Sequence, residues 1–262
     1  MRIDRALTRR SFVQSIGGTV SALYASRFGG LDLSSADPAQ AVLRSRPRKP
    51  TETAKTGMQP LGLGFGRDGF LYVPSTYKSD KATPLLVLLH GATQDSTLWS
   101  RGPLDKIFDN PAIIVLAPDS RERTWDLSLG GYGPDCRFID DALALTFRKC
   151  NVDPARIALG GFSDGASYAL SLGISNGDLF SALIALSPGF IAPARRKGTP
   201  RIFISHGTQD QILPIDETSR TIVPELKEAG FPVHYEEFDG PHTVTVNEMT
   251  TAMRWFVPGS KL

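Results

Sequence analysis

RIALGGFSDGASYALSLGIS, residues 156–175, joins an apolar run to an alanine- and leucine-rich run through a turn of the pattern Gly-x-Ser-x-Gly. The first run is typical of a buried strand and the second of a helix. A serine at such a turn projects its hydroxyl above the edge of a sheet, and Gly161 and Gly165 remove side chains that would clash there. We therefore predict Ser163 as a catalytic nucleophile. A role as helix N-cap would explain the serine but not the two glycines.

The segments around this turn alternate between strands and helices. Short apolar runs predict strands at residues 70–73, 85–90, 113–117, 157–161, 183–186, 202–206 and 233–238. Helical patterns lie at residues 104–109, 138–150, 165–175, 216–229 and 246–256. Several strands are apolar along their whole length, which is typical of strands buried on both faces of a sheet. The alternation predicts an α/β fold with a wound, mostly parallel central sheet flanked by helices.

A general base and an acid that orients it are expected after other strands of the sheet, because ligands bind at the carboxyl ends of parallel strands. His242 lies in a loop downstream of the serine and is the candidate base. The other histidines end strands or lie inside one: His90, His206 and His234. Asp210 is predicted to hold the imidazole in the required tautomer and to stabilise the imidazolium. The chain order serine, acid, histidine supports this assignment. Asp239 is a weaker rival, because its closeness to His242 in sequence favours a turn.

Two backbone N–H groups are expected to stabilise the negative oxygen of a tetrahedral intermediate. Asp164 supplies one directly after the serine, and its side chain is expected to face solvent. Ala92 supplies the other, where small residues after a strand let the backbone approach a ligand. Gln94 either reaches this region or caps the turn. Four aromatic residues in loops at the same edge are candidates for a substrate pocket, with ordinary core packing as the alternative: Trp99, Trp125, Tyr132 and Phe190.

The N-terminus carries paired arginines, Arg9 and Arg10, followed by Phe12 and then by a mildly apolar stretch rich in glycine, serine and alanine. This pattern resembles a bacterial twin-arginine export signal. The stretch is too short and too polar to span a bilayer, which needs about 20 mostly apolar residues. We predict export by the twin-arginine machinery to the periplasm or beyond, without a stable membrane span. Ala39-Gln40-Ala41 fits a small-residue cleavage site, and Leu23-Tyr24-Ala25 is a second candidate.

Composition divides the chain into three parts. Residues 1–41 form the predicted signal. Residues 42–60 are rich in arginine, lysine, proline and threonine and predict a flexible linker. Residues 61–262 suffice for one catalytic domain.

Charge and cysteine content exclude several classes of partner. The formal net charge is +2, and basic residues after position 60 are interleaved with acids, so no nucleic-acid surface is expected. Cys136 and Cys150 flank a predicted helix that would hold them roughly 20 Å apart, whereas a disulfide tolerates about 7 Å. We predict two free thiols. Cysteines and histidines are not clustered, so no metal site is expected.

Taken together, these motifs resemble the α/β-hydrolase serine esterases of the phospholipase/carboxylesterase group, with feruloyl esterases and polyhydroxybutyrate depolymerases as neighbours. The resemblance spans about residues 69–256. It is carried by His90-Gly91, Gly161-Phe162-Ser163-Asp164-Gly165, Ala185-Leu186-Ser187-Pro188-Gly189, His206-Gly207 with Asp210 and Pro214, and Gly240 with His242. Many members have glutamine and two glycines where this chain has Asp164-Gly165-Ala166. The resemblance implies hydrolysis of small carboxylic esters or thioesters through an acyl-enzyme, without a cofactor.

Two other functions fit the same motifs. A peptidase or amidase shares the triad and differs in its pocket and leaving group. A binding protein that kept the fold and lost activity would lack a catalytic element, and none is missing by pattern. Only 15 residues separate the predicted strands at 183–186 and 202–206, so we expect a minimal fold without a helical cap and an open site.

Overall fold

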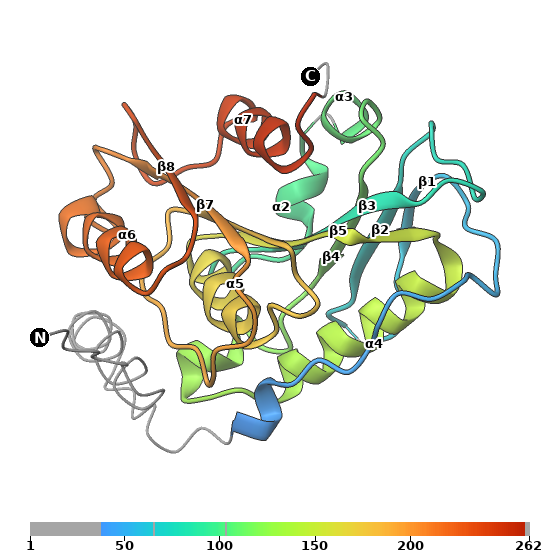
Figure 1. Cartoon of the computed structure of the whole chain (residues 1–262), viewed down its shortest axis with the longest axis horizontal. Helices are drawn as coiled ribbons and strands as arrows, with labels where there is room; N and C mark the ends of the chain where they lie inside the picture. Colours follow the sequence, from blue (N-terminus) through green and yellow to red (C-terminus); the bar gives the residue numbers. More distant parts are fainter. Residues whose placement is uncertain (1–37, 65, 103, 260–262) are drawn as a thin grey trace, which may run out of the picture.

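A single mixed sheet forms the centre of the molecule. The computed structural model describes residues 38–64, 66–102 and 104–259, so the predicted export signal lies almost wholly outside the described residues. The eight strands follow the order β1-β2-β4-β3-β5-β6-β7-β8 (Figure 1). β2 runs antiparallel to both β1 and β4, and all other neighbours are parallel. This is the predicted α/β-hydrolase arrangement of a mostly parallel sheet with flanking helices.

The elements follow the predicted alternation. The strands are β1 (Gly57–Pro60), β2 (Gly69–Val73), β3 (Thr83–Leu89), β4 (Ile114–Pro118), β5 (Val152–Phe162), β6 (Ala182–Leu186), β7 (Arg201–Gly207) and β8 (Val233–Phe238). The α-helices are α2 (Thr97–Ser100), α3 (Leu104–Phe108), α4 (Pro134–Lys149), α5 (Asp164–Ser175), α6 (Ser219–Glu228) and α7 (Val246–Phe256). Short 3-10 helices are η2 (Pro38–Ala41), η3 (Asp126–Leu129) and η4 (Ile215–Glu217). Within the described ranges, no helix has the length and apolar character that crossing a membrane requires.

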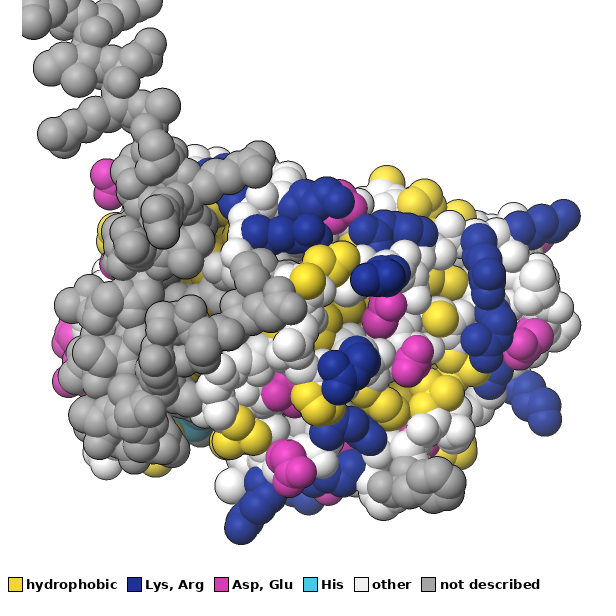
Figure 2. Space-filling view, turned by 90° about the horizontal axis from the view of Figure 1, so that it is seen from below, with side chains coloured by type: hydrophobic (Ala, Val, Ile, Leu, Met, Phe, Trp, Pro, Cys, Tyr) yellow, Lys and Arg dark blue, Asp and Glu magenta, His cyan; other side chains and the backbone are white. Residues whose placement is uncertain are grey.

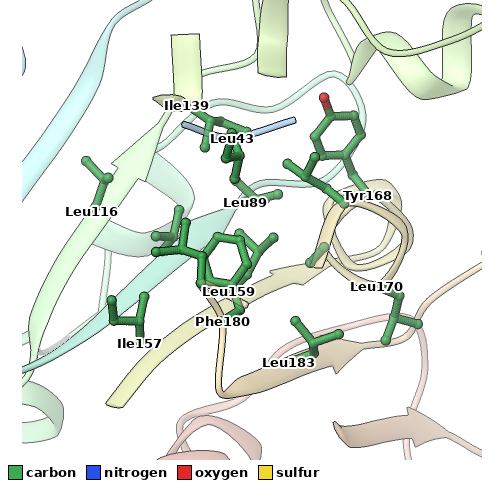
Figure 3. Packing of buried hydrophobic residues seen from close by; sticks show 14 of the residues in the cluster. Leu43, Leu89, Leu116, Ile139, Ile157, Leu159, Tyr168, Leu170, Phe180 and Leu183 are labelled. Atoms are coloured by element: carbon green, nitrogen blue, oxygen red, sulfur yellow. The ribbon is translucent and has the colours of Figure 1, made fainter. Parts of the chain in front are cut away.

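The apolar strands separate two hydrophobic clusters. Along β3, Leu85, Val87 and Leu89 belong to one cluster, and the alternating Leu86 and Leu88 belong to the other. Helices α4, α5 and α6 pack on the first face of the sheet, and α2, α3 and α7 pack on the opposite face (Figure 1). Figure 3 shows the first cluster, in which strand residues meet side chains of α4 and α5. Burial on both faces explains why these strands lack alternating polar residues.

The carboxyl ends of the central strands meet at one edge of the sheet. The register pairs Leu89 of β3 with Gly161 of β5, Phe162 of β5 with Leu186 of β6, and β7 with β8. The loops that follow these ends carry the predicted catalytic residues. The fully described residues 187–200 between β6 and β7 contain no helix, so no cap is inserted there.

Residues 42–60 are not the flexible linker that their composition predicted. Leu43 is fully buried, and its amide donates to the Asn176 side chain at 3.0 Å. The amides of Arg44 and Ser45 both donate to Asp140 of α4 at 2.8 Å. Further along, β1 adds an antiparallel strand to the sheet. The prediction was wrong because tertiary hydrogen bonds order an extended segment that has no periodic pattern of its own.

The basic residues of this segment lie on its outer side. Arg44, Arg46 and Arg48 are exposed, whereas the residues between them are partly buried. Figure 2 shows the molecule from below the view of Figure 1, and on this face Lys and Arg side chains are interspersed with acidic and hydrophobic ones. The composition that suggested a solvated linker therefore reflects one exposed side of a packed segment.

The two cysteines are free, as predicted, and both are buried. Cys136 lies in the first turn of α4, and Cys150 follows its last residue. Burial raises the pKa of both thiols to about 12.

Candidate active site

Ser163 occupies a sharp turn between β5 and α5. Its φ of 57° and ψ of −120° are unusual for a residue with a side chain and are typical of strained functional turns. A Cβ atom at Gly161 would lie 2.4 Å from the carbonyl oxygen of Gly165, and one at Gly165 would lie 2.4 Å from that of His90. The turn therefore requires both glycines. The Ser163 side chain makes no capping hydrogen bond to α5, which removes the N-cap alternative.

A hydrogen-bonded chain links the serine to the predicted base and acid. His242 Nε2 lies 2.8 Å from Ser163 Oγ, and His242 Nδ1 lies 2.5 Å from Asp210 Oδ2. A carboxylate only accepts hydrogen bonds, so Nδ1 carries the proton and Nε2 is free to accept from the serine. The ring of Phe162 lies against the imidazole, with centroids 4.7 Å apart. The structure thus brings together three residues that are 32 and 79 positions apart in sequence.

Asp210 is an ionised carboxylate held by several donors. Its Oδ1 accepts from the amides of Ile212 and Leu213 at 2.9 and 2.8 Å. Burial alone raises the pKa of Asp210, but hydrogen bonds from His206 and His242 outweigh burial and hold the pKa well below its usual value. A charged acid in a fixed orientation is what an imidazolium beside it needs. The rival Asp239 instead accepts from Gln209 at 2.6 Å.

The turn after β3 presents the Ala92 amide to the site. The Gln94 side chain accepts from the Gly91 amide at 3.1 Å, so Gln94 caps this turn. Thr93 has a φ of 63°, and its amide donates to the backbone carbonyl of Arg123 at 2.6 Å. Among the described residues, none accepts a hydrogen bond from the Ala92 amide, which therefore remains available to a ligand.

The side chain of Asp164 does not face solvent as expected. It is 1% exposed and accepts hydrogen bonds from the hydroxyls of Thr124 and Ser128. The amide of Trp125 also donates to it at 3.2 Å. Asp164 thereby ties the turn of the nucleophile to the loop that contains η3. The sequence carried no local sign of this contact, because the three partners lie 36 to 40 positions away.

A cavity of about 270 Å³ lies beside Ser163 and His242. Its walls include Phe162 and the apolar pair Ile212 and Leu213. Sequence reasoning did not single out that pair, although two apolar residues directly after the predicted acid were a usable signal. The cavity offers an apolar surface next to the serine hydroxyl.

The four aromatic residues proposed as a pocket do not line this cavity. Trp125 is fully buried, and its indole N–H donates to the His90 carbonyl at 2.8 Å. Tyr132 and Phe190 belong to the same hydrophobic cluster as Trp125. Trp99 is buried on the opposite face of the sheet, beside a separate cleft against α7. All four are core residues: Trp99 is the buried residue of α2, and Trp125, Tyr132 and Phe190 lie in segments that fold inward over the sheet.

The remaining histidines have other partners. His90 Nε2 accepts from the Ser120 amide at 2.9 Å, and burial lowers the pKa of this ring. His234 is exposed and pairs with Glu236 at 2.8 Å. His206 is buried beside Asp210, a placement that the sequence did not predict. Only His242 contacts the serine among the four.

Sequence comparison relates this chain to known esterases. Residues 137–257 match the family model described as phospholipase/carboxylesterase. The chain is 27% identical over 154 residues to a bifunctional acetylxylan esterase/xylanase of Neocallimastix patriciarum. This match covers 57% of this chain and 22% of that protein. It is 26% identical over 166 residues to a probable feruloyl esterase C of Aspergillus niger, covering 58% of this chain and 57% of that one. The matches therefore span about a fifth and somewhat more than half of these relatives' lengths.

Solved structures share the fold at low sequence identity. An S-formylglutathione hydrolase of Staphylococcus aureus superposes with a TM-score of 0.63 at 16% identity, covering 78% of this chain and 100% of that one. The esterase PE8 gives a TM-score of 0.53 at 22% identity, covering 71% and 96%. A ferulic acid esterase of Anaeromyces mucronatus gives 0.55 at 17% identity, covering 82% and 94%.

The sheet order, the strained serine turn and these shared folds define an α/β-hydrolase. Within that class, residues 137–257 match the phospholipase/carboxylesterase family, with feruloyl esterases and other esterases as neighbours. The family resemblance expected from the motifs is confirmed.

Proposed function

We propose that this hydrolase cleaves small carboxylic esters or thioesters through an acyl-enzyme on Ser163. The observation that carries the proposal is the continuous hydrogen-bonded chain from Ser163 through His242 to Asp210, beside a cavity open to a ligand. The chain is that of a serine nucleophile, its general base and the acid that orients the base.

Acylation follows from this geometry. His242 Nε2 takes the hydroxyl proton as Ser163 Oγ attacks the ester carbonyl. The carbonyl oxygen becomes an oxyanion, which the backbone N–H groups of Ala92 and Asp164 stabilise. Collapse of the tetrahedral intermediate breaks the ester C–O bond, and His242 returns its proton to the leaving alkoxide. Asp210 balances the charge of the imidazolium in both steps.

Deacylation repeats the sequence with water. His242 removes a proton from a water molecule as its oxygen attacks the acyl carbonyl. The second tetrahedral intermediate then expels Ser163, which regains its proton from His242. The products are a carboxylic acid and the free enzyme.

The site favours a compact acyl or aryl group on a soluble ester. Phe162, Ile212 and Leu213 line an apolar cavity of about 270 Å³, and no cap covers it in the described chain. Curated relatives are named for acetylxylan and feruloyl esters. Both are esters of small acids, so we include acetyl and feruloyl compounds among the substrates of this proposal.

Hydrolysis of p-nitrophenyl esters from acetate to decanoate, together with methyl ferulate, tests the proposal. We expect Ser163→Ala to lose at least about 10³-fold in kcat, and the exposed control Ser79→Ala to keep wild-type rates. The chain length with the highest kcat/KM then measures the acyl cavity. Equal rates in wild type and Ser163→Ala contradict the proposal, and turnover of a p-nitroanilide without ester turnover favours an amidase.

We also propose that the precursor is exported by the twin-arginine route and processed before residue 38. The carbonyl of Ala41 accepts from Asn176 at 2.7 Å, and Ala41 is fully buried. Cleavage after Ala25 leaves this contact intact, whereas cleavage after Ala41 removes Ala41 and leaves only the bond from the Leu43 amide to Asn176. This favours the earlier of the two predicted sites. Mass spectrometry of the mature N-terminus, with Arg9→Lys/Arg10→Lys as the export-deficient control, tests both statements.

A further inference from the structure

A second imidazole contacts the acid of the site. His206, near the end of β7, is fully buried, and its Nε2 lies 3.0 Å from Asp210 Oδ2. This is the same oxygen that His242 Nδ1 approaches at 2.5 Å. His206 Nε2 also lies 2.9 Å from the carbonyl oxygen of Leu213, and Nδ1 lies 2.7 Å from Ser219 Oγ.

The partners determine where His206 holds its proton. A carboxylate and a carbonyl are acceptors only, so Nε2 must carry a hydrogen. A hydroxyl both donates and accepts, so Ser219 at the start of α6 donates to Nδ1 when the ring is neutral. Every polar atom of this buried ring is then satisfied, and the ring can neither rotate nor change tautomer without leaving a buried group unpaired.

We propose that His206 is a positioning residue of the catalytic machinery, acting through Asp210. Its Nε2–H fixes one oxygen of Asp210 toward His242 and at the same time fixes the Leu213 carbonyl. The inference rests on the proposed function of Ser163 and deepens it. The ordered series Ser219, His206, Asp210, His242, Ser163 then extends the triad by two residues.

The same contacts connect the acid to the substrate cavity. Asp210 Oδ1 accepts from the amides of Ile212 and Leu213, which line that cavity. His206 binds the carbonyl of Leu213, so the turn after Asp210 is held from both ends. Removing the His206 donor therefore has two effects at once: the Asp210 carboxylate is free to rotate, and the cavity wall formed by Ile212 and Leu213 becomes less rigid.

The other buried histidine shows the contrast. His90 Nδ1 faces the Gly91 carbonyl, and its Nε2 faces the Ser120 amide and, at 3.3 Å, the Arg67 guanidinium. His206 instead faces the charged acid of the site. If the role of His206 is purely structural, its substitution lowers stability. The effect on kcat then does not depend on whether the new side chain can donate a hydrogen bond to Asp210.

Two amide substitutions separate these roles. In His206→Gln the side-chain amide nitrogen reaches the position of Nε2, whereas in His206→Asn it reaches only the region of Nδ1. With p-nitrophenyl acetate, we expect His206→Asn to lower kcat roughly 10–100-fold, and His206→Gln to stay near wild type. KM is expected to change less than kcat, because the charge of the imidazolium develops only in the transition state.

A spectroscopic signature tests the inference without substrate. The proton between His242 Nδ1 and Asp210 lies in a 2.5 Å hydrogen bond and should give a strongly deshielded proton NMR resonance. We expect His206→Asn to shift or broaden this resonance and His206→Gln to retain it. Ser219→Ala, which leaves the imidazole in place, is expected to shift it in the same direction by less.

The outcomes are distinct. The positioning role is overturned if both His206 variants keep the wild-type kcat and the wild-type resonance. It is also overturned if both variants lose kcat equally at matched melting temperature. If His206→Asn does not fold, the Ser219→Ala resonance decides, and an unchanged signal overturns the inference. Absence of ester hydrolysis by the wild type contradicts the proposed function, whereas the resonance still tests the contact between His206 and Asp210.

Discussion

The side-chain carboxyls of Asp126 and Asp135 each accept a hydrogen bond from the backbone amide of the other residue. The Asp126 amide donates to Asp135 Oδ2 at 2.6 Å, and the Asp135 amide donates to Asp126 Oδ2 at 2.8 Å. Burial first, and then the negative charge of Asp126, raise the pKa of Asp135 to about 7. Burial also raises the pKa of Asp126. This pair closes a loop that also contacts Asp164 through Ser128, which lies between the two aspartates.

The Asp135 carboxyl gives the stability of the fold a dependence on pH. Its pKa is higher in the folded chain than its ordinary value of 3.8, so the folded state keeps a proton that the unfolded chain has released. Stability from this group is therefore complete below about pH 4 and declines as the pH rises to about 7. We expect wild type to lose on the order of 1–4 kcal/mol over this range relative to Asp135→Asn. Thermal melts of both proteins at constant ionic strength measure the difference, and parallel curves contradict it.

The nucleophile, base and acid positions could be predicted because their signals are local. The glycines at 161 and 165 are required by contacts within one turn and with the adjacent strand. Parallel strands place their carboxyl ends at one edge, so residues after separate strands meet without any knowledge of packing. Asp210 and His242 follow from this rule and from their order in the chain.

Other features depend on partners distant in sequence and had no local signal. Asp164 is buried because Thr124 and Ser128 fold over it. Leu43 is ordered by Asn176, 133 positions away. Trp125 occupies the core although its loop follows a strand end, because side-chain direction in a loop is fixed by packing. The elements β1 and α2, of four residues each, are too short for periodicity to detect.

The hydrogen bonds that tether Asp164 to Thr124, Trp125 and Ser128 should make kcat depend on the order of the loop that contains η3. Asp164→Ala leaves the donors of Thr124, Trp125 and Ser128 without their acceptor, at a cost of about 1–3 kcal/mol for each one that stays buried. We expect a lower melting temperature and a lower kcat, because the Asp164 amide is a proposed oxyanion donor. Ser128→Ala removes one donor only and should have a smaller effect. A double-mutant cycle measures their coupling, and full additivity of the two changes argues against the tether.

Residues 42–60 should contribute to stability as a packed segment. Leu43→Ala removes a fully buried side chain and is expected to lower the free energy of unfolding by about 2–5 kcal/mol. Arg44→Ala is the matched control, since this exposed side chain leaves the backbone bond to Asp140 in place and should cost less than about 0.5 kcal/mol. Urea unfolding compares the two. If Leu43→Ala and Arg44→Ala both change the free energy of unfolding by the same small amount, the interpretation of residues 42–60 as a flexible linker holds after all.

Asp210→Asn should separate orientation from charge in the triad. An asparagine keeps the size of the carboxylate, but its amide nitrogen can donate to His242 Nδ1, which leaves the proton on Nε2 and removes the acceptor that Ser163 needs. We expect kcat to fall roughly 10³- to 10⁴-fold. The melting temperature is expected to fall as well, because the amide nitrogen also faces the Nε2–H of His206, a second donor. Asp239→Asn is the control, because Asp239 accepts from Gln209 rather than from His242, and it should keep wild-type kcat. Loss of activity in Asp239→Asn with activity retained in Asp210→Asn would transfer the orienting role to the acid three residues before His242.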